Sequence, residues 1–461
     1  MKIQFCGASR IVTGSCYHLT INDKEYLVDC GMFQGKKETT RLNYEPFLFD
    51  PKKITALFLT HAHIDHSGLI PKLYKGGFRG KIYATKPTID LCRIMLLDSA
   101  HIQEMDTEHE NRRRLRLGLP TRKPLYTQLE ATQCMKLFST IRYDSLKKID
   151  DNVTVRYRDA GHILGSSIIQ LFANDKGTEK KIVFSGDLGQ WNVPIVRNPT
   201  YINEADYLFI ESTYGDRLHE DVKEREDELL DAINSVVEKE GKLLIPSFAI
   251  ERTQELLYSF KKLILQKRFP KGIKIFLDSP LAIKATEIFK KHKEVYDQET
   301  LYKFKNPFEF PQLKYTLSTE ESIKLNDCKK PCIIIAGSGM MNAGRIRHHL
   351  KHGLWDERNT VLIVGYQAEG TLGRIILDGV KNVKMMGMEI RVGAEIRKIN
   401  SFSAHADYED ILEWLSGFEK SPKRVFIVHG EEKSAKSLKK KIAKVGLKNS
   451  YIPHIGDVIE I

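Results

Sequence analysis

The stretch His61-Ala62-His63-Ile64-Asp65-His66 places three histidines and one aspartate within six positions. The preceding residues 54–60 are mostly apolar and β-prone, which is typical of a buried strand. Residues 67–74 then have the pattern of a short helix. We therefore expect four potential metal ligands on a loop where a core strand ends.

The spacing within this loop predicts two groups of ligands. Side chains two positions apart in an extended chain point the same way, so His61 and His63 can share one ion. If the chain then turns into a helix, Asp65 and His66 face a second side, where a second ion fits. Imidazole and carboxylate groups at this density suit zinc or another borderline divalent metal.

The composition predicts a soluble, basic protein with a polyanionic partner. The 461 residues can bury two or three cores, and no apolar run reaches the length of a membrane span. Seven scattered cysteines and a start unlike a signal peptide predict a cytoplasmic location. The net charge of +12 favours nucleic acid as the partner. The basic clusters at 112–116 and 439–441 fit solvated faces as well as contact sites.

Three further side chains follow other expected strands in the first 210 residues. Asp29 ends one strand and, beside a metal loop, is best placed to orient a ligand or the loop itself. His162 lies on a Gly-flanked loop after a strand at 153–158, where a lone histidine more often has no function. Asp187 follows a strand at 181–184, and its two oxygens can bridge two ions. Between these strands, the periodicity of residues 87–140 predicts helix.

Helices alternate with apolar strands from Glu211 to roughly residue 395, beginning with a charged helix at 221–240. This pattern predicts βαβ units, a mostly parallel sheet and a second domain. After about residue 395, the pattern again resembles that of the first 210 residues. His405 precedes a helix expected at 408–415, and a core strand at 424–428 ends at His429.

Within the second domain, the Gly-rich residues 336–345 connect a strand to a helix. Backbone N–H groups, the helix start and the charge of Arg345 can together hold an anion near Ser338. The same loop fits a plain tight turn equally well. Ser247 and Arg252, at another strand-to-helix junction, form a weaker version of this arrangement.

These residues, taken in order, resemble the motifs of a known superfamily. Four motifs are similar to those of the metallo-β-lactamase superfamily, namely Asp29, the His61–His66 loop, His162 and Asp187. Three more resemble those of its β-CASP nucleases, namely Glu211 in FIESTYG, His405 in SAHAD and His429 in VHGE. The resemblance covers the whole chain and is strongest to short stand-alone prokaryotic members, which are related to the endonuclease subunit of the mRNA 3′-end cleavage factor.

The resemblance implies an α/β fold with three segments. Residues 1–210 and 396–461 would form an αββα sandwich, and residues 211–395 would form an inserted β-CASP domain. The active site would lie in the cleft between them. The implied activity is hydrolysis of phosphodiester bonds in single-stranded RNA.

The resemblance also implies two zinc ions, with manganese or another divalent metal as the alternative. The ligands would be His61, His63 and His162 for one ion, Asp65, His66 and His429 for the other, and Asp187 between them. Two such ions activate a water for in-line attack at phosphorus. His405 would then protonate the leaving ribose oxygen with Glu211 holding its second ring proton, while Asp65 is an alternative proton acceptor. Ser338, Arg345, Ser247 and Arg252 would hold neighbouring phosphates.

Other functions share parts of this pattern. A hydrolase of small esters, thioesters or lactams would have the same His-rich loop but would not need the second domain. A non-catalytic RNA-binding homologue would lack ligands, and here no ligand position is missing. A DNA nuclease of this family typically has an apolar residue where this chain has His429, so RNA is favoured. Endonucleolytic cleavage, 5′ exonucleolytic cleavage and a homodimer all remain compatible with the sequence.

Overall fold

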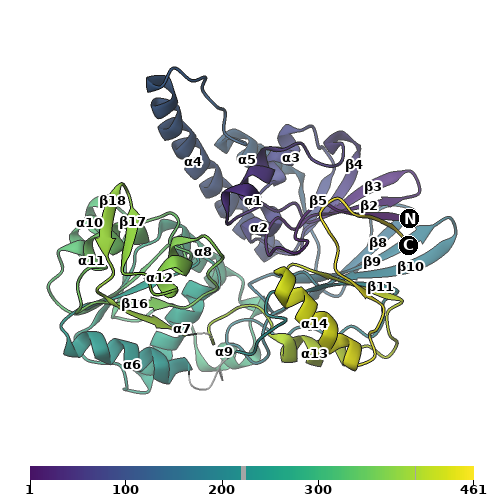
Figure 1. The fold of residues 1–461 in the computed structure, drawn as a ribbon. Helices are drawn as coiled ribbons and strands as arrows, with labels where there is room; N and C mark the ends of the chain where they lie inside the picture. Colours follow the sequence, from purple (N-terminus) through teal and green to yellow (C-terminus); the bar gives the residue numbers. More distant parts are fainter. Residues whose placement is uncertain (220–224, 400) are drawn as a thin grey trace. The chain divides into compact units, whose positions relative to one another are not determined.

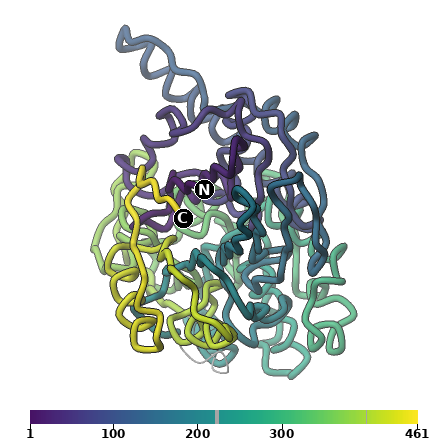
Figure 2. The backbone as a smooth tube through the Cα atoms, turned by 90° about the vertical axis from the view of Figure 1, so that its right-hand side faces the viewer, coloured from purple at the N-terminus to yellow at the C-terminus, as the bar shows by residue number. Residues whose placement is uncertain are grey.

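In the computed structural model, strand β22 (Val458–Glu460) pairs with β1 (Lys2–Phe5), so the two ends of the chain lie side by side (Figure 2). The structure describes residues 1–219, 225–399 and 401–461. The chain forms two units. The first comprises Met1–Asn192, Arg197–Leu218 and His405–Ile461, and the second comprises Val193–Val196 and His219–Ala404.

Two seven-stranded sheets form the first unit (Figure 1). The first sheet has the order β22, β1, β2 (Tyr17–Ile21), β3 (Lys24–Val28), β4 (Ile54–Phe58), β5 (Lys81–Ala84) and β6 (Phe138–Thr140). The second has the order β21 (Ser450–Tyr451), β20 (Arg424–Val428), β11 (Tyr207–Glu211), β10 (Thr178–Phe184), β9 (Ser167–Asp175), β8 (Val153–Asp159) and β7 (Leu146–Lys148).

Alternation of side chains along β11 shows how the layers are made. Phe209 packs in the core between the two sheets. The centroid of its ring lies 4.3 Å from the ring centroid of Phe184 and 4.7 Å from that of Phe426. The neighbouring residue Ile210 points to the opposite face and packs with the buried Trp414 of α13 (Tyr408–Leu415). Successive residues of a strand face opposite sides of the sheet, so an apolar run can serve both cores.

Helices cover the outer faces of both sheets. On the second sheet, α13 and α14 (Glu432–Lys444) contribute Trp414 and Leu438 to the core. The helices of the first sheet's side are α1 (Lys37–Arg41), α2 (Ile64–Ser67), α3 (Ile70–Lys75), α4 (Lys86–Arg116) and α5 (Gln128–Cys134) (Figure 1). This layering confirms the predicted αββα sandwich. Among the described residues, no helix has the length and apolar character needed to cross a membrane.

The second unit contains a six-stranded sheet whose described pairings are all parallel, as predicted. The strand order is β14 (Leu313–Tyr315), β13 (Lys274–Leu277), β15 (Cys332–Ala336), β12 (Lys242–Pro246), β16 (Thr360–Ile363) and β19 (Glu395–Lys398), with a separate hairpin of β17 (Asn382–Met385) and β18 (Met388–Arg391). The helices are α6 (Arg225–Glu238), α7 (Arg252–Leu265), α8 (Pro280–Lys291), α9 (Gln298–Lys303), α10 (Thr319–Asn326), α11 (Ile346–Gly353) and α12 (Leu372–Leu377).

Some boundaries differ from those expected. The units divide after Leu218 and after Ala404, later than the predicted boundaries at 210/211 and 395/396. The reason is that β19 pairs with β16 beyond residue 395, while Ser212 remains bonded to His429 of the first unit.

Residues 138–140, expected to be helical, form an edge strand beside β5. The predicted helix at 221–240 begins in residues outside those described, and α6 covers Arg225–Glu238 but not the last two predicted residues.

We predict that Phe209→Ala lowers the free energy of unfolding by about 3–5 kcal/mol, because it opens a cavity between the two sheets. Urea denaturation followed by circular dichroism measures the change. The control is Leu129→Ala, because that side chain is 63% exposed and its loss should cost less than about 0.5 kcal/mol. Equal effects of the two substitutions would show that Phe209 does not carry the sandwich core.

Candidate metal centre

The candidate ligands gather at one edge of the second sheet and on the His61–His66 loop, all within the first unit. Strands β10, β11 and β20 are parallel neighbours, so their carboxyl ends meet at the same edge. Asp187 follows β10, Glu211 ends β11 and His429 follows β20. The order of the strands thus brings together side chains that are far apart in sequence.

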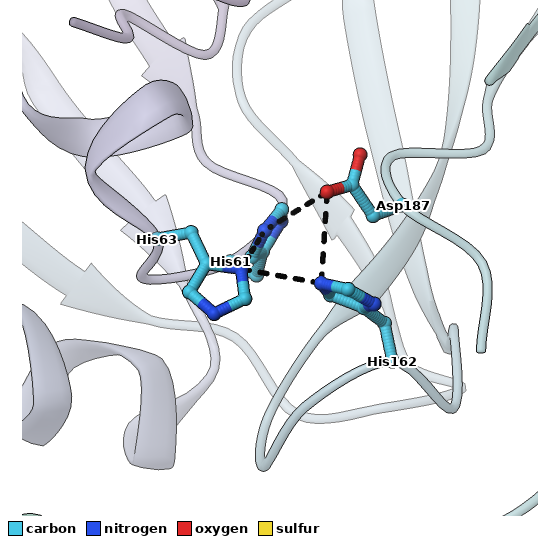
Figure 3. A group of neighbouring side chains, drawn as sticks. All are labelled: His61, His63, His162 and Asp187. Carbon is cyan, nitrogen blue, oxygen red and sulfur yellow. Dashed lines mark hydrogen bonds and ion pairs between the residues drawn. The ribbon is translucent and has the colours of Figure 1, made fainter. Parts of the chain in front are cut away.

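The first group consists of His61, His63, His162 and Asp187 (Figure 3). Nδ1 of His63 lies 3.1 Å from Nε2 of His61 and 3.2 Å from Nε2 of His162. Oδ2 of Asp187 lies 3.5 Å and 3.6 Å from the same two Nε2 atoms. Zinc–nitrogen bonds of about 2.0–2.1 Å in tetrahedral geometry separate neighbouring ligand atoms by about 3.3 Å. The four residues therefore fit around one ion.

Burial keeps this group ready to bind a cation. Burial lowers the pKa of His61 well below its usual value and the pKa of His63 to about 4. The negative charge of Asp187 opposes this effect on both rings, and that of Asp65 opposes it on His63. Both rings are therefore neutral at pH 7 in the metal-free protein. A neutral ring offers a lone pair, which a metal ion requires.

The second group consists of Asp65, His66 and His429. The Nε2 atoms of His66 and His429 are 3.1 Å apart, and Oδ2 of Asp65 lies 3.6 Å from Nε2 of His429. The other oxygen of Asp187, Oδ1, lies 3.2 Å from Nε2 of His66. The carboxylate of Asp187 therefore faces the first group with one oxygen and the second group with the other.

Asp187 is the residue whose surroundings point most directly to bound cations. Its side chain is 1% exposed, and neither oxygen accepts a hydrogen bond from any described residue. Burial alone would raise its pKa, but His429 and His66 outweigh burial and hold the pKa well below its usual value. A buried ionised carboxylate without donors is costly, and metal coordination removes that cost.

Asp29 and Thr60 contact the ring nitrogens of the candidate ligands His66 and His61 and so fix their orientation. Oδ2 of Asp29 lies 2.7 Å from Nδ1 of His66, and Oδ1 accepts the backbone N–H of Thr60 at 2.8 Å. The Thr60 hydroxyl lies 3.1 Å from Nδ1 of His61. Asp187 and Asp29 outweigh burial and raise the pKa of His66 well above its usual value, so a metal ion at Nε2 would have to displace the proton there while Nδ1 keeps its bond to Asp29.

Sequence reasoning missed the hydroxyl groups around the ligands. Thr60 contacts Asp29 and His61, and Thr213 Oγ1 lies 3.2 Å from Nδ1 of His429. The position of Thr60 directly before His61 at a strand end was the available signal for it. No comparable signal marked Thr213, because its contact depends on the pairing of β11 with β20.

His405 and Glu211 lie beside Asp187. Nδ1 of His405 is 3.1 Å from Oε2 of Glu211, and the other Glu211 oxygen accepts the N–H of Leu188 at 2.6 Å. Burial would lower the pKa of His405, but Glu211 and then Asp187 raise it to about 9. The ring is therefore protonated at pH 7 in the metal-free protein, with Nδ1 bonded to Glu211. These residues also lie close enough to Asp187 and His429 to hold a metal.

The four residues expected to hold phosphates lie in the second unit and have partners within the chain. Arg345 donates to Asp278 at 2.6 Å and to two backbone carbonyls. Arg252 is buried and pairs with Glu255. The hydroxyl of Ser338 bonds to Ala343, and that of Ser247 lies 3.0 Å from the hydroxyl of Thr253. Each of the four side chains thus has a partner within the chain, although Nε of Arg252 is buried without one among the described residues, and phosphate binding by them stays a prediction.

We predict that Arg345→Ala lowers the free energy of unfolding by about 1–3 kcal/mol, because the fully buried Asp278 loses a charged hydrogen bond. Thermal denaturation measures this loss. Lys329→Ala, an exposed cation of the same unit, is the control and should cost less than about 0.5 kcal/mol. If Arg345→Ala leaves stability unchanged but weakens RNA binding, Arg345 serves a phosphate rather than Asp278.

Comparisons with known proteins agree with this geometry. Residues 18–192 match the metallo-beta-lactamase superfamily domain, residues 253–376 the Beta-Casp domain, and residues 389–453 the Zn-dependent metallo-hydrolase RNA specificity domain. A ribonuclease of Thermus thermophilus is 36% identical over 97% of each chain. An RNase J-like protein of Methanocaldococcus jannaschii is 30% identical over 100% of this chain and 99% of its own.

Two further relatives extend the comparison. The transcription termination factor FttA of Methanocaldococcus jannaschii is 30% identical over 100% of this chain and 72% of its own length. A crystal structure of a protein of unknown function from Enterococcus faecalis has a TM-score of 0.56 and 13% identity, covering 100% of this chain and 99% of its own, and shows the fold alone. The chain therefore belongs to the metallo-β-lactamase superfamily and, within it, to the β-CASP family.

Proposed function

We propose that the protein is a metal-dependent ribonuclease that hydrolyses phosphodiester bonds of single-stranded RNA and uses two zinc ions. The observation that carries this proposal is Asp187, a buried carboxylate without hydrogen-bond donors among the described residues, which lies between two groups of ligands. Manganese or another divalent ion suits the same imidazole and carboxylate set.

The ligands divide by their geometry. His61, His63 and His162 would hold one ion, and Asp65, His66 and His429 would hold the other, with Asp187 shared. Two divalent ions in such a site lower the pKa of a water and stabilise the entering and leaving oxygens at phosphorus. Asp29 and Thr60 would keep the histidine rings in orientation.

Support for RNA as the substrate comes from the relatives and from charge. Relatives that match this chain over nearly its full length bear the names ribonuclease and RNase J-like protein, and residues 389–453 match an RNA specificity domain. The net charge of +12 suits a polyanion.

The free thiols of all seven cysteines suit the reducing cytoplasm, where we place the protein.

His405 and Glu211 would supply the proton for the leaving group. A ribose oxygen leaves more readily when a general acid protonates it. His405 is charged in the metal-free protein, and the hydrogen bond from Nδ1 to Glu211 directs Nε2 to that task. In an alternative role, Asp65 would take a proton from the attacking water.

We predict that His63→Ala abolishes RNA cleavage and reduces the bound metal, because His63 Nδ1 lies within 3.2 Å of two other ligand atoms. Elemental analysis measures the metal, and gel assays with end-labelled and internally labelled RNA measure cleavage and separate endonuclease from 5′ exonuclease action. A chelator should have the same effect on the unmodified protein.

The control for this experiment is His454→Ala, because His454 is exposed and lies outside both ligand groups. It should retain metal and activity. Cleavage of RNA that survives exhaustive removal of metal would contradict the proposal. Faster cleavage of single-stranded DNA than of RNA would identify the related DNA nuclease, and hydrolysis of thioesters without RNA cleavage would identify a small-substrate hydrolase.

We predict that His405→Ala keeps both metals but slows RNA cleavage by about 10²–10⁴-fold, the usual range for loss of a general acid. The loss should shrink on a substrate whose leaving group needs no protonation. Glu211→Gln should give a milder defect of the same kind, because Glu211 orients the ring. Cleavage rates and metal content are measured on the same preparations.

The alternative assignment makes His405 a metal ligand. In that case His405→Ala would lose metal, and the defect would be equally large on every substrate. This outcome would remove His405 from the role of acid and place it with Asp187 and His429 in metal binding.

A further inference from the structure

Helix α4 forms an arm that starts beside the loop carrying His162. Its first turn is fixed to the His162 loop, because the hydroxyls of Thr85 and Thr88 both donate to the carbonyl of Gly165 at 2.7 and 2.8 Å. The helix has 31 residues, which corresponds to a length of about 46 Å. Both views show its far end projecting from the rest of the first unit (Figure 1 and Figure 2).

The end of the arm has a defined structure. Gly118 ends the helix with φ +66°, and the N–H groups of Gly118 and Leu119 bond back to the carbonyls of Leu115 and Arg114. The chain then returns along the helix. The side chain of Asn111 accepts the N–H of Arg122 and donates to its carbonyl, both at 2.8 Å.

Positive charge is concentrated on this tip, which we define as residues 111–123. It carries six cations and no acidic residue, namely Arg112, Arg113, Arg114, Arg116, Arg122 and Lys123. Arg112 pairs with Glu108, and Arg113 lies 3.9 Å from Glu110. Among the described residues, no carboxylate pairs with the side chains of Arg116, Arg122 or Lys123, and all three are exposed.

The favourable interaction of cations with the helix dipole explains only part of the positive charge at the tip. Cations in the last turn of a helix interact favourably with its dipole, which accounts for Arg113, Arg114 and Arg116. Arg122 and Lys123 lie beyond the helix, where that effect is absent. They stand beside the arginines because the bonds of Asn111 fix the returning chain. Glu108 and Glu110, which precede the tip on the helix, offset Arg112 and Arg113, so the exposed positive charge without a paired carboxylate among the described residues lies on Arg116, Arg122 and Lys123.

We propose that the tip of α4 binds the phosphate backbone of the RNA substrate, away from the scissile bond. This inference rests on the proposed ribonuclease function. The tip contains no aromatic residue, so it cannot stack bases and would bind phosphates without regard to sequence. Arg112 lies 26 residues from the start of α4, about 39 Å along the helix. Only an RNA long enough to span that distance can occupy both the metal centre and the tip.

The test is a variant in which Arg113, Arg116, Arg122 and Lys123 are replaced by Gln. Asn111 and Arg114, whose side chains hold the returning chain, are kept. The matched control replaces four exposed cations elsewhere in the first unit by Gln, namely Lys52, Lys53, Lys147 and Lys176. Both proteins lose the same charge, so a general electrostatic effect would be equal in the two.

Binding of a long single-stranded RNA to chelator-treated protein is measured by fluorescence anisotropy at several salt concentrations. We expect the tip variant to bind about 10–100-fold more weakly and its salt slope to fall by about 0.7 for each phosphate that it no longer neutralises. In the metal-loaded enzyme, KM for that RNA should rise. The rate on a small activated phosphodiester should stay unchanged, because that substrate cannot reach the tip.

Equal binding by the tip variant and the unmodified protein would overturn the inference, as would equal weakening in the tip variant and the control. Either result would leave the exposed Leu115 and Leu117 as a candidate surface for a protein partner. If the unmodified protein fails to cleave RNA while the tip still sets RNA affinity, the proposed ribonuclease function fails and the binding surface stands.

Discussion

The candidate metal centre is organised around one unfavourable placement, the carboxylate of Asp187 in a buried site without hydrogen-bond donors among the described residues. Imidazole nitrogens from both ligand groups lie within 3.6 Å of its two oxygens. In the metal-free protein, the nearby His429 and His66 outweigh the effect of burial and keep the carboxylate ionised. Two cations would satisfy the carboxylate and the ring nitrogens together, and in that case metal binding and the local structure would stabilise each other.

The sandwich supplies the edge on which this site is built. Parallel strands β10, β11 and β20 end at the same level and present Asp187, Glu211 and His429. Phe209, at the centre of β11, ties these strands to the first sheet through the aromatic core. The loop between β8 and β9 of the second sheet carries His162 and also holds the start of α4 through Gly165. The element that positions this ligand therefore also positions the helix that ends in the basic tip.

Much of the site could be predicted from sequence, because metal ligands at strand ends leave a dense pattern. The His61–His66 loop, Asp187 and His429 were all predicted in this way and lie together in the structure, and the sandwich followed from the resemblance they carry. The contacts of Thr213 and Arg345 could not be found, because each partner lies on a strand or loop far away in the chain. Arg345 pairs with Asp278 across 67 positions, and a local pattern of glycines and an arginine contains no sign of that carboxylate.

The central claim is that two metal ions lie on either side of Asp187. The most direct measurement is a crystal structure of the zinc-loaded protein with anomalous diffraction recorded at the zinc edge. The account predicts two peaks about 3.5–4 Å apart, one beside His61, His63 and His162 and the other beside Asp65, His66 and His429. A single peak, or a peak coordinated by His405 and Glu211, would contradict it.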